Sequence, residues 1–322
     1  MSDGDQAFRK QDPLGRWPEM TYGGALSFLR RPYTRDLDGV DVAVWGVPFD
    51  TAVTYRPGCR LGPRAIRAGS VQLAELKAFP FGFDPFDVLR VVDWGDVMLD
   101  PHQPGVAEAI EAACAGIIAG GTASLALGGD HFIAWPLLKA HAAMHGPLAL
   151  IQFDAHGDLW PDDRARVDHG TMMGRAISDG IVDASRSTQI GIRTYHADQM
   201  GLEILTAPWV HRHGVDAAIE VAVARAGGAP VYISFDIDVL DPSAAPGTGT
   251  PVAGGLASWQ ALEILRGLGA LNLVGMDLVE VSPPFDQAEI TAIAAATVAH
   301  DWLCLLAEKK GAVRQPIGRA GR

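Results

Sequence analysis

Residues 148–158, LALIQFDAHGD, decide the fold of this chain. A continuous apolar run leads into Asp154, His156 and Asp158, which stand at every second position. Continuous apolar runs are typical of strands buried on both faces of a parallel sheet. Alternate side chains of an extended strand share a face, so we expect these three polar groups to converge on one point where the strand ends.

Similar apolar runs recur along the chain and alternate with helical patterns. Strands are predicted at 40–47, 89–95, 124–129, 148–154, 188–193, 230–236 and 271–280. Helices are predicted at 105–119, 134–144, 215–226, 258–268 and 289–307. Ser258 suits the N-cap of the helix at 258–268, and Pro63 suits the first turn of another helix. The alternation predicts a parallel sheet covered on both faces, in a single domain over 1–322 with peripheral tails at about 1–20 and 311–322.

Composition limits the class of partner. The 322 residues carry a formal net charge of −12, which argues against nucleic acid and suits a small cationic substrate. Cys59, Cys114 and Cys304 are far apart and lack metal-ligand spacing, so neither disulfides nor a thiolate metal site is predicted. The sequence shows neither the pattern of a signal peptide nor an uninterrupted apolar run of spanning length. We therefore expect a soluble cytoplasmic protein without a membrane partner.

Acidic and imidazole side chains end four of the predicted strands. They are Asp130 and His131, then Asp154, His156 and Asp158, then Asp236 and Asp238, then Glu280. A single Asp at a strand end is usually a turn former or an N-cap, but six of these groups, delivered to one rim by three of the strand ends, repel or lose solvation unless cations lie among them. Oxygen-rich ligands with a few imidazoles and no thiolates suit Mn²⁺, with Ni²⁺, Co²⁺ and Zn²⁺ as alternatives. Four carboxylates and two histidines predict two ions, which together can activate one water.

Longer motifs carry a family resemblance. GGDH (128–131), FDAHGD (153–158) and SFDIDVLDPSAAPGTGTP (234–251) stand between GVPFDTAVTYRPGCRLGPRAIR (46–67) and GMDLVEVSPPFDQAEIT (275–291). Over roughly residues 20–310 the chain resembles the ureohydrolases, the arginase and agmatinase superfamily, and the agmatinase branch most closely. The resemblance implies a three-layer α/β/α fold with a mostly parallel sheet of about eight strands. It also implies hydrolysis of a guanidino compound to urea and an amine, commonly by a homo-oligomer, a trimer or a hexamer.

The resemblance implies roles for individual residues. One divalent ion, Mn²⁺ by expectation and Ni²⁺ by alternative, would be held by His131, Asp154, Asp158 and Asp236. A second would be held by Asp154, His156, Asp236 and Asp238. Asp158 would also orient the attacking water, Glu280 would grip the guanidinium, and His169 would pass a proton to the departing amine. A carboxylate can accept two parallel N–H bonds from a guanidinium, which suits the role of Glu280.

The substrate is less certain, because the chain departs from the agmatinase pattern. That branch usually has Thr after the His of its DAHTD motif, followed by Thr-Tyr, whereas Gly157, Leu159 and Trp160 stand here. We expect Gly157 and Trp160, with His169 and Glu280, to shape the substrate site, and Met173 to line it as well. Agmatine is the default substrate. 4-Guanidinobutyrate and 3-guanidinopropionate are close rivals, and guanidine, small N-alkylated guanidines or biguanides remain open, some of them with Ni²⁺.

Two other classes of protein are weighed against this one. A histone-deacetylase-like amide hydrolase works with one zinc ion and a reduced second site, whereas both half-sites are complete here. A non-catalytic subunit of a hetero-oligomer would lack a ligand, His169 or Glu280, and none of these is missing. Both alternatives are therefore disfavoured.

Overall fold

The computed structural model describes residues 22–74, 76–100, 105–164 and 168–315. Their strands form one eight-stranded sheet in the order β2-β1-β3-β8-β7-β4-β5-β6, and every pair is parallel. The strands are β1 Val42–Val47, β2 Val91–Asp96, β3 Ala123–Gly128, β4 Ala149–Phe153, β5 Thr188–Ile192, β6 Glu203–Thr206, β7 Pro230–Asp236 and β8 Asn272–Val279. The predicted α/β architecture with about eight strands is confirmed.

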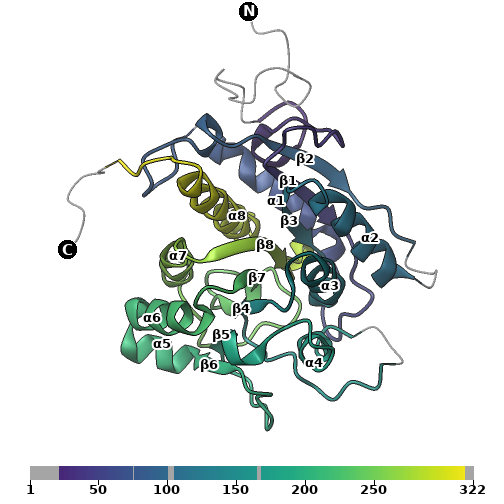
Figure 1. Cartoon of the computed structure of the whole chain (residues 1–322), viewed down its shortest axis with the longest axis vertical. Helices are drawn as coiled ribbons and strands as arrows, with labels where there is room; N and C mark the ends of the chain where they lie inside the picture. Colours follow the sequence, from purple (N-terminus) through teal and green to yellow (C-terminus); the bar gives the residue numbers. More distant parts are fainter. Residues whose placement is uncertain (1–21, 75, 101–104, 165–167, 316–322) are drawn as a thin grey trace, which may run out of the picture.

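Two layers of helices cover the sheet (Figure 1). One layer contains α1 Gly62–Ser70, α5 Ala207–His213, α6 Val215–Ala226, α7 Ser258–Gly267 and α8 Ile290–Lys309. The other contains α2 Val106–Ile118, α3 Ala134–His145 and α4 Met172–Ser178. By length and composition alone α8 could cross a membrane, but 78% of its apolar window is buried inside the protein, as in a core helix.

Some local predictions need correction. Pro63 does lie in the first turn of α1, but the N-cap of α7 is Ala257, whose backbone is extended, and Ser258 is already helical. The Ala257 N–H is accepted by Gln260 Oε1 at 3.0 Å, so a side chain from inside the helix supplies the cap. Of the predicted tails, 1–20 and 316–322 lie outside the described residues. The described part of the second tail contacts the body of the protein, because Gln315 N donates to Phe81 O at 3.0 Å.

Three short elements were not predicted. They are the edge strand β6, the helix α5 that follows it, and α4 after His169. Strands of four residues and helices of seven are too short to show a clear hydrophobic period. The long buried elements, by contrast, lie within a few residues of their predicted bounds.

The strand order explains where a ligand site forms. The four strands whose ends carry acidic and imidazole groups are β3, β8, β7 and β4, and these are adjacent in the middle of the sheet. In open parallel sheets ligands bind beyond the carboxyl ends of the strands. The polar groups of four distant chain segments therefore meet at one edge.

Candidate metal centre and active site

A cavity of about 530 Å³ opens beyond the carboxyl ends of the central strands. Its walls combine residues of the predicted metal site with residues of the loops around it. They are Thr54, His131, His156, Asp158, Trp160, Pro161, Asp168, His169, Gly170, Thr171, Asp236 and Thr250. Most of the predicted site is therefore brought together.

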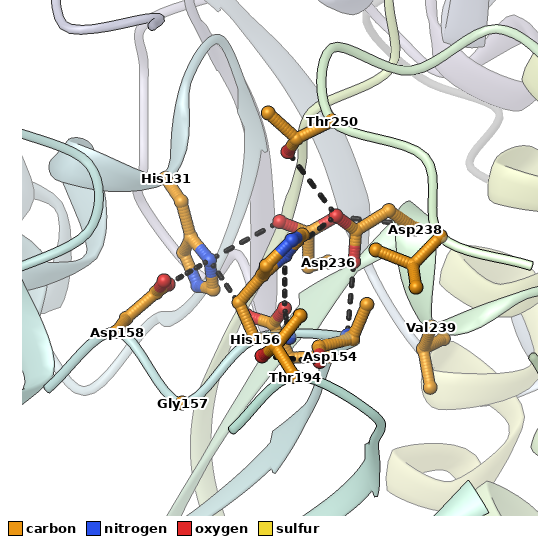
Figure 2. A network of polar contacts seen from close by, with 12 residues as sticks. His131, Asp154, His156, Gly157, Asp158, Thr194, Asp236, Asp238, Val239 and Thr250 are labelled. Carbon is orange, nitrogen blue, oxygen red and sulfur yellow. Dashed lines mark hydrogen bonds and ion pairs between the residues drawn. The ribbon is translucent and has the colours of Figure 1, made fainter. Parts of the chain in front are cut away.

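The first half of the metal centre is built around His131, which follows β3. Its Nδ1 lies 3.1 Å from Asp154 Oδ2, 3.0 Å from Asp158 Oδ2 and 3.2 Å from Asp236 Oδ2 (Figure 2). The nitrogen is buried and forms no hydrogen bond of normal geometry with any of the described residues. A proton on Nδ1 can form a good hydrogen bond with only one of these oxygens, whereas a divalent cation placed among the four atoms could contact all of them.

The other ring nitrogen of His131 fixes its tautomer. His131 Nε2 lies 2.8 Å from Ser234 Oγ, and this hydroxyl donates to Asp277 Oδ1 at 2.8 Å. Since the serine proton is used on Asp277, Nε2–H donates to Ser234 and Nδ1 is left to the carboxylates. Burial lowers the pKa of His131, but the contacts with Asp154, Asp158 and Asp236 outweigh it and raise this pKa, so Nδ1 carries a proton that a bound metal ion would displace. Supporting bonds of this kind orient the histidine ligands of metals.

The second half of the centre is built around His156, which is half-buried at the cavity wall. Its Nδ1 lies 3.0 Å from Asp238 Oδ2 and 3.4 Å from Asp154 Oδ1. Asp238 is held by the Ala155 N–H at 3.0 Å and by the Thr250 hydroxyl at 3.4 Å (Figure 2). Two ligand groups result, one of His131, Asp154 and Asp236 and one of Asp154, His156 and Asp238, and within each the ligand atoms lie within 4.8 Å of one another.

Asp154 is common to both groups. Its Oδ2 faces His131 and its Oδ1 faces His156, so each oxygen belongs to a different half-site. The backbone N–H of His156 also donates to Asp154 Oδ1 at 2.6 Å. Asp236 joins only the first group in this geometry, and its Oδ1 accepts the Asp238 backbone N–H at 2.8 Å. The predicted bridging role fits Asp154 directly, and for Asp236 it stays a prediction.

The electrostatics of the site call for positive charge. Burial and the charges of Asp238 and Asp154 raise the pKa of Asp236 well above its usual value. Burial and the Asp154 charge raise the pKa of Asp158 to about 6, against the opposite effect of His131. Burial also raises the pKa of Asp154, but the hydrogen bonds and charges of His131 and His156 outweigh it and lower this pKa. Asp236 and Asp158, by contrast, resist ionisation without a further cation. The residues present thus fit a pair of divalent ions in both donor chemistry and charge.

A second polar cluster joins His169 to Glu280. His169 Nδ1 lies 3.1 Å from Glu280 Oε1, while the Thr54 N–H and hydroxyl lie 3.3 and 2.9 Å from Nε2. Nδ1–H is directed at Glu280 in either protonation state; in the neutral ring Nε2 accepts from Thr54, and in the protonated ring Nε2–H can donate to the Thr54 hydroxyl. Burial lowers the pKa of His169, but the hydrogen bond and charge of Glu280 outweigh it and raise this pKa to about 9.

Glu280 lies just behind the cavity wall. It is 1% exposed and is not among the residues that line the cavity. Its Oε1 also accepts the His131 N–H at 2.9 Å, whereas its buried Oε2 has no N–H or O–H partner among the described residues. The neighbouring Cys59 thiol is a weak donor, and burial together with the Glu280 charge raises its pKa. Direct contact between Glu280 and a substrate stays a prediction.

Two of the predicted substrate-site residues are misplaced. Gly157 does not line the cavity, and its carbonyl instead accepts a hydrogen bond from Gln189 Nε2 at 2.7 Å. Met173 is fully buried in α4 and packs in the core between the sheet and α2–α4. The pocket roles expected of both are corrected. Trp160 and His169 do line the cavity, as predicted.

Several residues of the site were not predicted. Thr54, Asp168 and Thr250 line the cavity, and Ser234 supports His131. Ser234 could have been found, because strand periodicity puts it on the face of Asp236. The others lie on loops, which carry no such pattern. The loop before His169 carries charges of both signs. Of these, Asp162 forms an ion pair with Arg175 of α4, and Arg166 lies outside the described residues.

Comparisons with known proteins agree with this geometry. The family model described as Arginase family matches residues 40–304. An agmatinase of Chromobacterium violaceum is 57% identical over 310 residues, which cover 95% of this chain and 96% of that protein. An agmatinase of Neisseria meningitidis serogroup C is 49% identical over 287 residues, or 88% of this chain and 92% of that protein.

Two solved structures are similar to this chain over most of its length. The crystal structure of a hypothetical agmatinase from Burkholderia thailandensis has a TM-score of 0.94 and 56% identity, covering 95% of this chain and 98% of that one. The proclavaminate amidino hydrolase of Streptomyces clavuligerus has a TM-score of 0.84 and 37% identity, covering 90% of this chain and 99% of that one.

Proposed function

The chain belongs to the arginase family, in the agmatinase branch of the ureohydrolases, and is a hydrolase of guanidino C–N bonds; from this premise we propose that its substrate is agmatine. Water would attack the guanidinium carbon, and the C–N bond to the butylamine chain would break. The products are urea and a diamine.

The chain's own residues would hold two divalent ions, by expectation Mn²⁺. Asp154 spans the two half-sites, with His131, Asp158 and Asp236 on one side and His156 and Asp238 on the other. When bound, such a pair lowers the pKa of a shared water and so supplies a nucleophile near neutral pH. The arginase family generally uses a binuclear centre of this kind, which supports the assignment.

His169 would act as the general acid. It lines the cavity, and Glu280 keeps it protonated up to about pH 9 by raising its pKa. The amine nitrogen of the C–N bond that breaks is a poor leaving group until it is protonated. An acid at this wall of the cavity, which can give it a proton, therefore favours cleavage. Asp158, on the same cavity surface, would orient the attacking water.

The charge of the cavity carries the proposal of agmatine as substrate. Asp158 and Asp236 are expected metal ligands, so Asp168 is the acidic residue of the lining outside the expected ligand set, and the described lining contains no Lys or Arg. Agmatine has a cation at both ends and suits such a lining. Arginine, 4-guanidinobutyrate and 3-guanidinopropionate carry a carboxylate, for which the described lining offers the like charge of Asp168 and no Lys or Arg.

Asp168 and Trp160 would receive the distal ammonium of agmatine. A Cβ on Gly170 would lie 2.9 Å from Trp160 Cδ1 and 3.4 Å from Asp168 Oδ1, so the indole and the carboxylate flank the same point of the wall. Trp160 is 57% exposed there. A carboxylate beside an indole is a suitable environment for an ammonium group, through ion pairing and a cation–π contact.

A urea-release assay tests the proposal. The protein is loaded with Mn²⁺ or with Ni²⁺ and given agmatine, arginine, 4-guanidinobutyrate, 3-guanidinopropionate, guanidine and dimethylated guanidines. Agmatine with Mn²⁺ should give the highest kcat/KM. A higher value for guanidine or an alkylated guanidine would reassign the substrate, and no urea from any of them would overturn the proposal.

The ammonium site has its own test. Asp168→Asn should raise KM for agmatine about 10-fold, or ~1.4 kcal/mol, and leave KM for N-butylguanidine, whose tail is neutral, unchanged. Asp163→Asn is the matched control, because Asp163 is exposed in the same loop and does not line the cavity. An equal effect of Asp168→Asn on both substrates would contradict the assigned role. Cytoplasmic location, single-domain organisation and homo-oligomeric state stay predictions.

A further inference from the structure

Two buried glutamines lie directly beneath the metal-binding loop. Gln152 on β4 and Gln189 on β5 are fully buried and stand opposite each other where the two strands pair. Buried amides are costly unless their polar atoms are hydrogen-bonded. Their partners therefore indicate what they are for.

The two side chains form a short chain of hydrogen bonds that ends on the metal site. Gln152 Nε2 donates to Asp154 Oδ2 at 2.7 Å. Gln189 Nε2 donates to Gln152 Oε1 at 2.6 Å and to the Gly157 carbonyl at 2.7 Å. The chain thus connects the side chain of Asp154 with the backbone of the loop three residues later.

The chemistry at the two ends sets the direction of this chain. An ionised carboxylate and a carbonyl can only accept hydrogen bonds, so amide nitrogens must face Asp154 and Gly157. Gln152 then presents its oxygen to Gln189, which donates to it. If Gln152 turned over, its oxygen would face the Asp154 carboxylate and lose both contacts. Gln189 therefore determines the orientation of Gln152.

We propose that Gln152 and Gln189 are positioning residues that hold Asp154 ready to bridge two metal ions. Gln152 holds Oδ2, which faces His131, while the His156 N–H holds Oδ1, which faces the other half-site. The inference rests on the proposed metal pair. With both oxygens fixed, the carboxylate has one orientation, and each oxygen keeps a lone pair for its own ion.

The Gly157 contact extends the same role to Asp158. Asp158 has a φ of 50°, in the left-handed region that side chains other than glycine seldom adopt. The bond from Gln189 to the Gly157 carbonyl fixes the peptide that precedes this residue. Gln189 therefore supports two expected ligands of the first half-site, Asp154 through Gln152 and Asp158 through the loop.

The test measures metal binding without turnover. Gln152→Leu keeps the size of the side chain and removes the donor, and we expect the Kd for Mn²⁺ to rise about 10- to 100-fold, as for other residues that support metal ligands. Equilibrium dialysis with elemental analysis gives the Kd, and EPR reports whether the bound Mn²⁺ ions still form a coupled pair. A Kd within two-fold of the wild-type value, with the coupled signal intact, would overturn the inference.

A control and a second variant keep the test decisive. Thr188→Val changes a buried neighbour on β5 whose hydroxyl has no hydrogen-bond partner among the described residues, so it should leave the Kd unchanged. Gln189→Leu should weaken binding in the same direction, and it serves alone if Gln152→Leu does not fold. Because Gln152 relays part of the effect of Gln189, the loss in the double variant should be smaller than the sum of the two single losses, although the separate contact of Gln189 with Gly157 adds to it. Additive losses would overturn the connection.

The outcomes separate this inference from the proposed function. If the wild-type protein binds no pair of ions, the metal assignment fails and the inference fails with it. If the wild type binds a pair and Gln152→Leu binds it equally well, only the inference fails. If the variants lose metal affinity while the wild type hydrolyses a substrate other than agmatine, the inference stands and the substrate changes.

Discussion

His169 Nδ1 lies 3.1 Å from Glu280 Oε1, although 111 residues separate the two in sequence. The contact links the loop after β4 with the end of β8, and it raises the pKa of His169 to about 9 despite the opposite effect of burial. A histidine with this pKa stays protonated at neutral pH and is available as an acid.

Replacing His169 by Asn should separate catalysis from metal binding. Removal of the general acid should lower kcat about 10²- to 10⁴-fold. Metal content should stay close to that of the wild type, because His169 is in neither ligand group. Stopped urea assays and elemental analysis of the same preparation measure the two quantities, and loss of metal from His169→Asn would show that its role is misassigned.

The pH dependence should follow the same pair. Because the protonated form of His169 is the active one, kcat should fall as the pH rises through about 9, where the proton is lost. Glu280→Gln removes the charge that raises this pKa, so the fall should move to lower pH. A kcat–pH profile of both proteins provides the measurement, and an unchanged profile in Glu280→Gln would refute the coupling. If Glu280 also grips the guanidinium, KM for agmatine should rise in the same variant.

Metal stoichiometry should distinguish Asp154 from Asp238. Asp154 belongs to both ligand groups and Asp238 to one. Asp154→Ala should therefore weaken both ions and abolish activity, while Asp238→Ala should weaken mainly one. Titration of the metal-free proteins with Mn²⁺ would count the sites, and two sites of normal affinity in Asp154→Ala would rule out its bridging role.

A buried ion pair away from the cavity should contribute strongly to the free energy of unfolding. Arg67 Nε and Nη2 donate to the two oxygens of Asp93 at 2.7 and 2.9 Å, and both side chains are buried. Arg67→Met leaves Asp93 buried without a cation and should lower the free energy of unfolding by about 3–5 kcal/mol. Urea unfolding followed by circular dichroism measures the loss. Arg64→Met, an exposed change on the same helix, should cost less than about 0.5 kcal/mol.

The clustering of the expected metal ligands could be predicted from sequence because its signal is local. Each stands directly after a continuous apolar run, and the carboxyl ends of parallel strands share one edge of a sheet. Asp154, His156 and Asp158 follow such a run, but β4 ends at Phe153 and Asp158 has a φ of 50°, so the loop rather than a continued strand brings the three together. The long strands and helices were predictable for the same reason.

The remaining parts of the site depend on contacts between distant segments. The position of β8 between β3 and β7 leaves no local pattern, and neither does the contact of Thr54 with His169. Met173 follows His169 by four residues and was expected to share its cavity. Its backbone is helical, however, and α4 turns its side chain into the core. Gly157 was expected to widen the pocket, but the loop uses its carbonyl as an anchor.

The place of β8 in the sheet also determines when the site can exist during synthesis. On one side the sheet has β2, β1 and β3, on the other β7, β4, β5 and β6, and β8 alone joins them. A nascent chain that has not yet released residues 272–280 from the ribosome carries every expected metal ligand, yet the strand that holds His131 beside Asp236 is absent. His131 and Asp236 can therefore come together as in the folded protein only after β8 has joined the sheet.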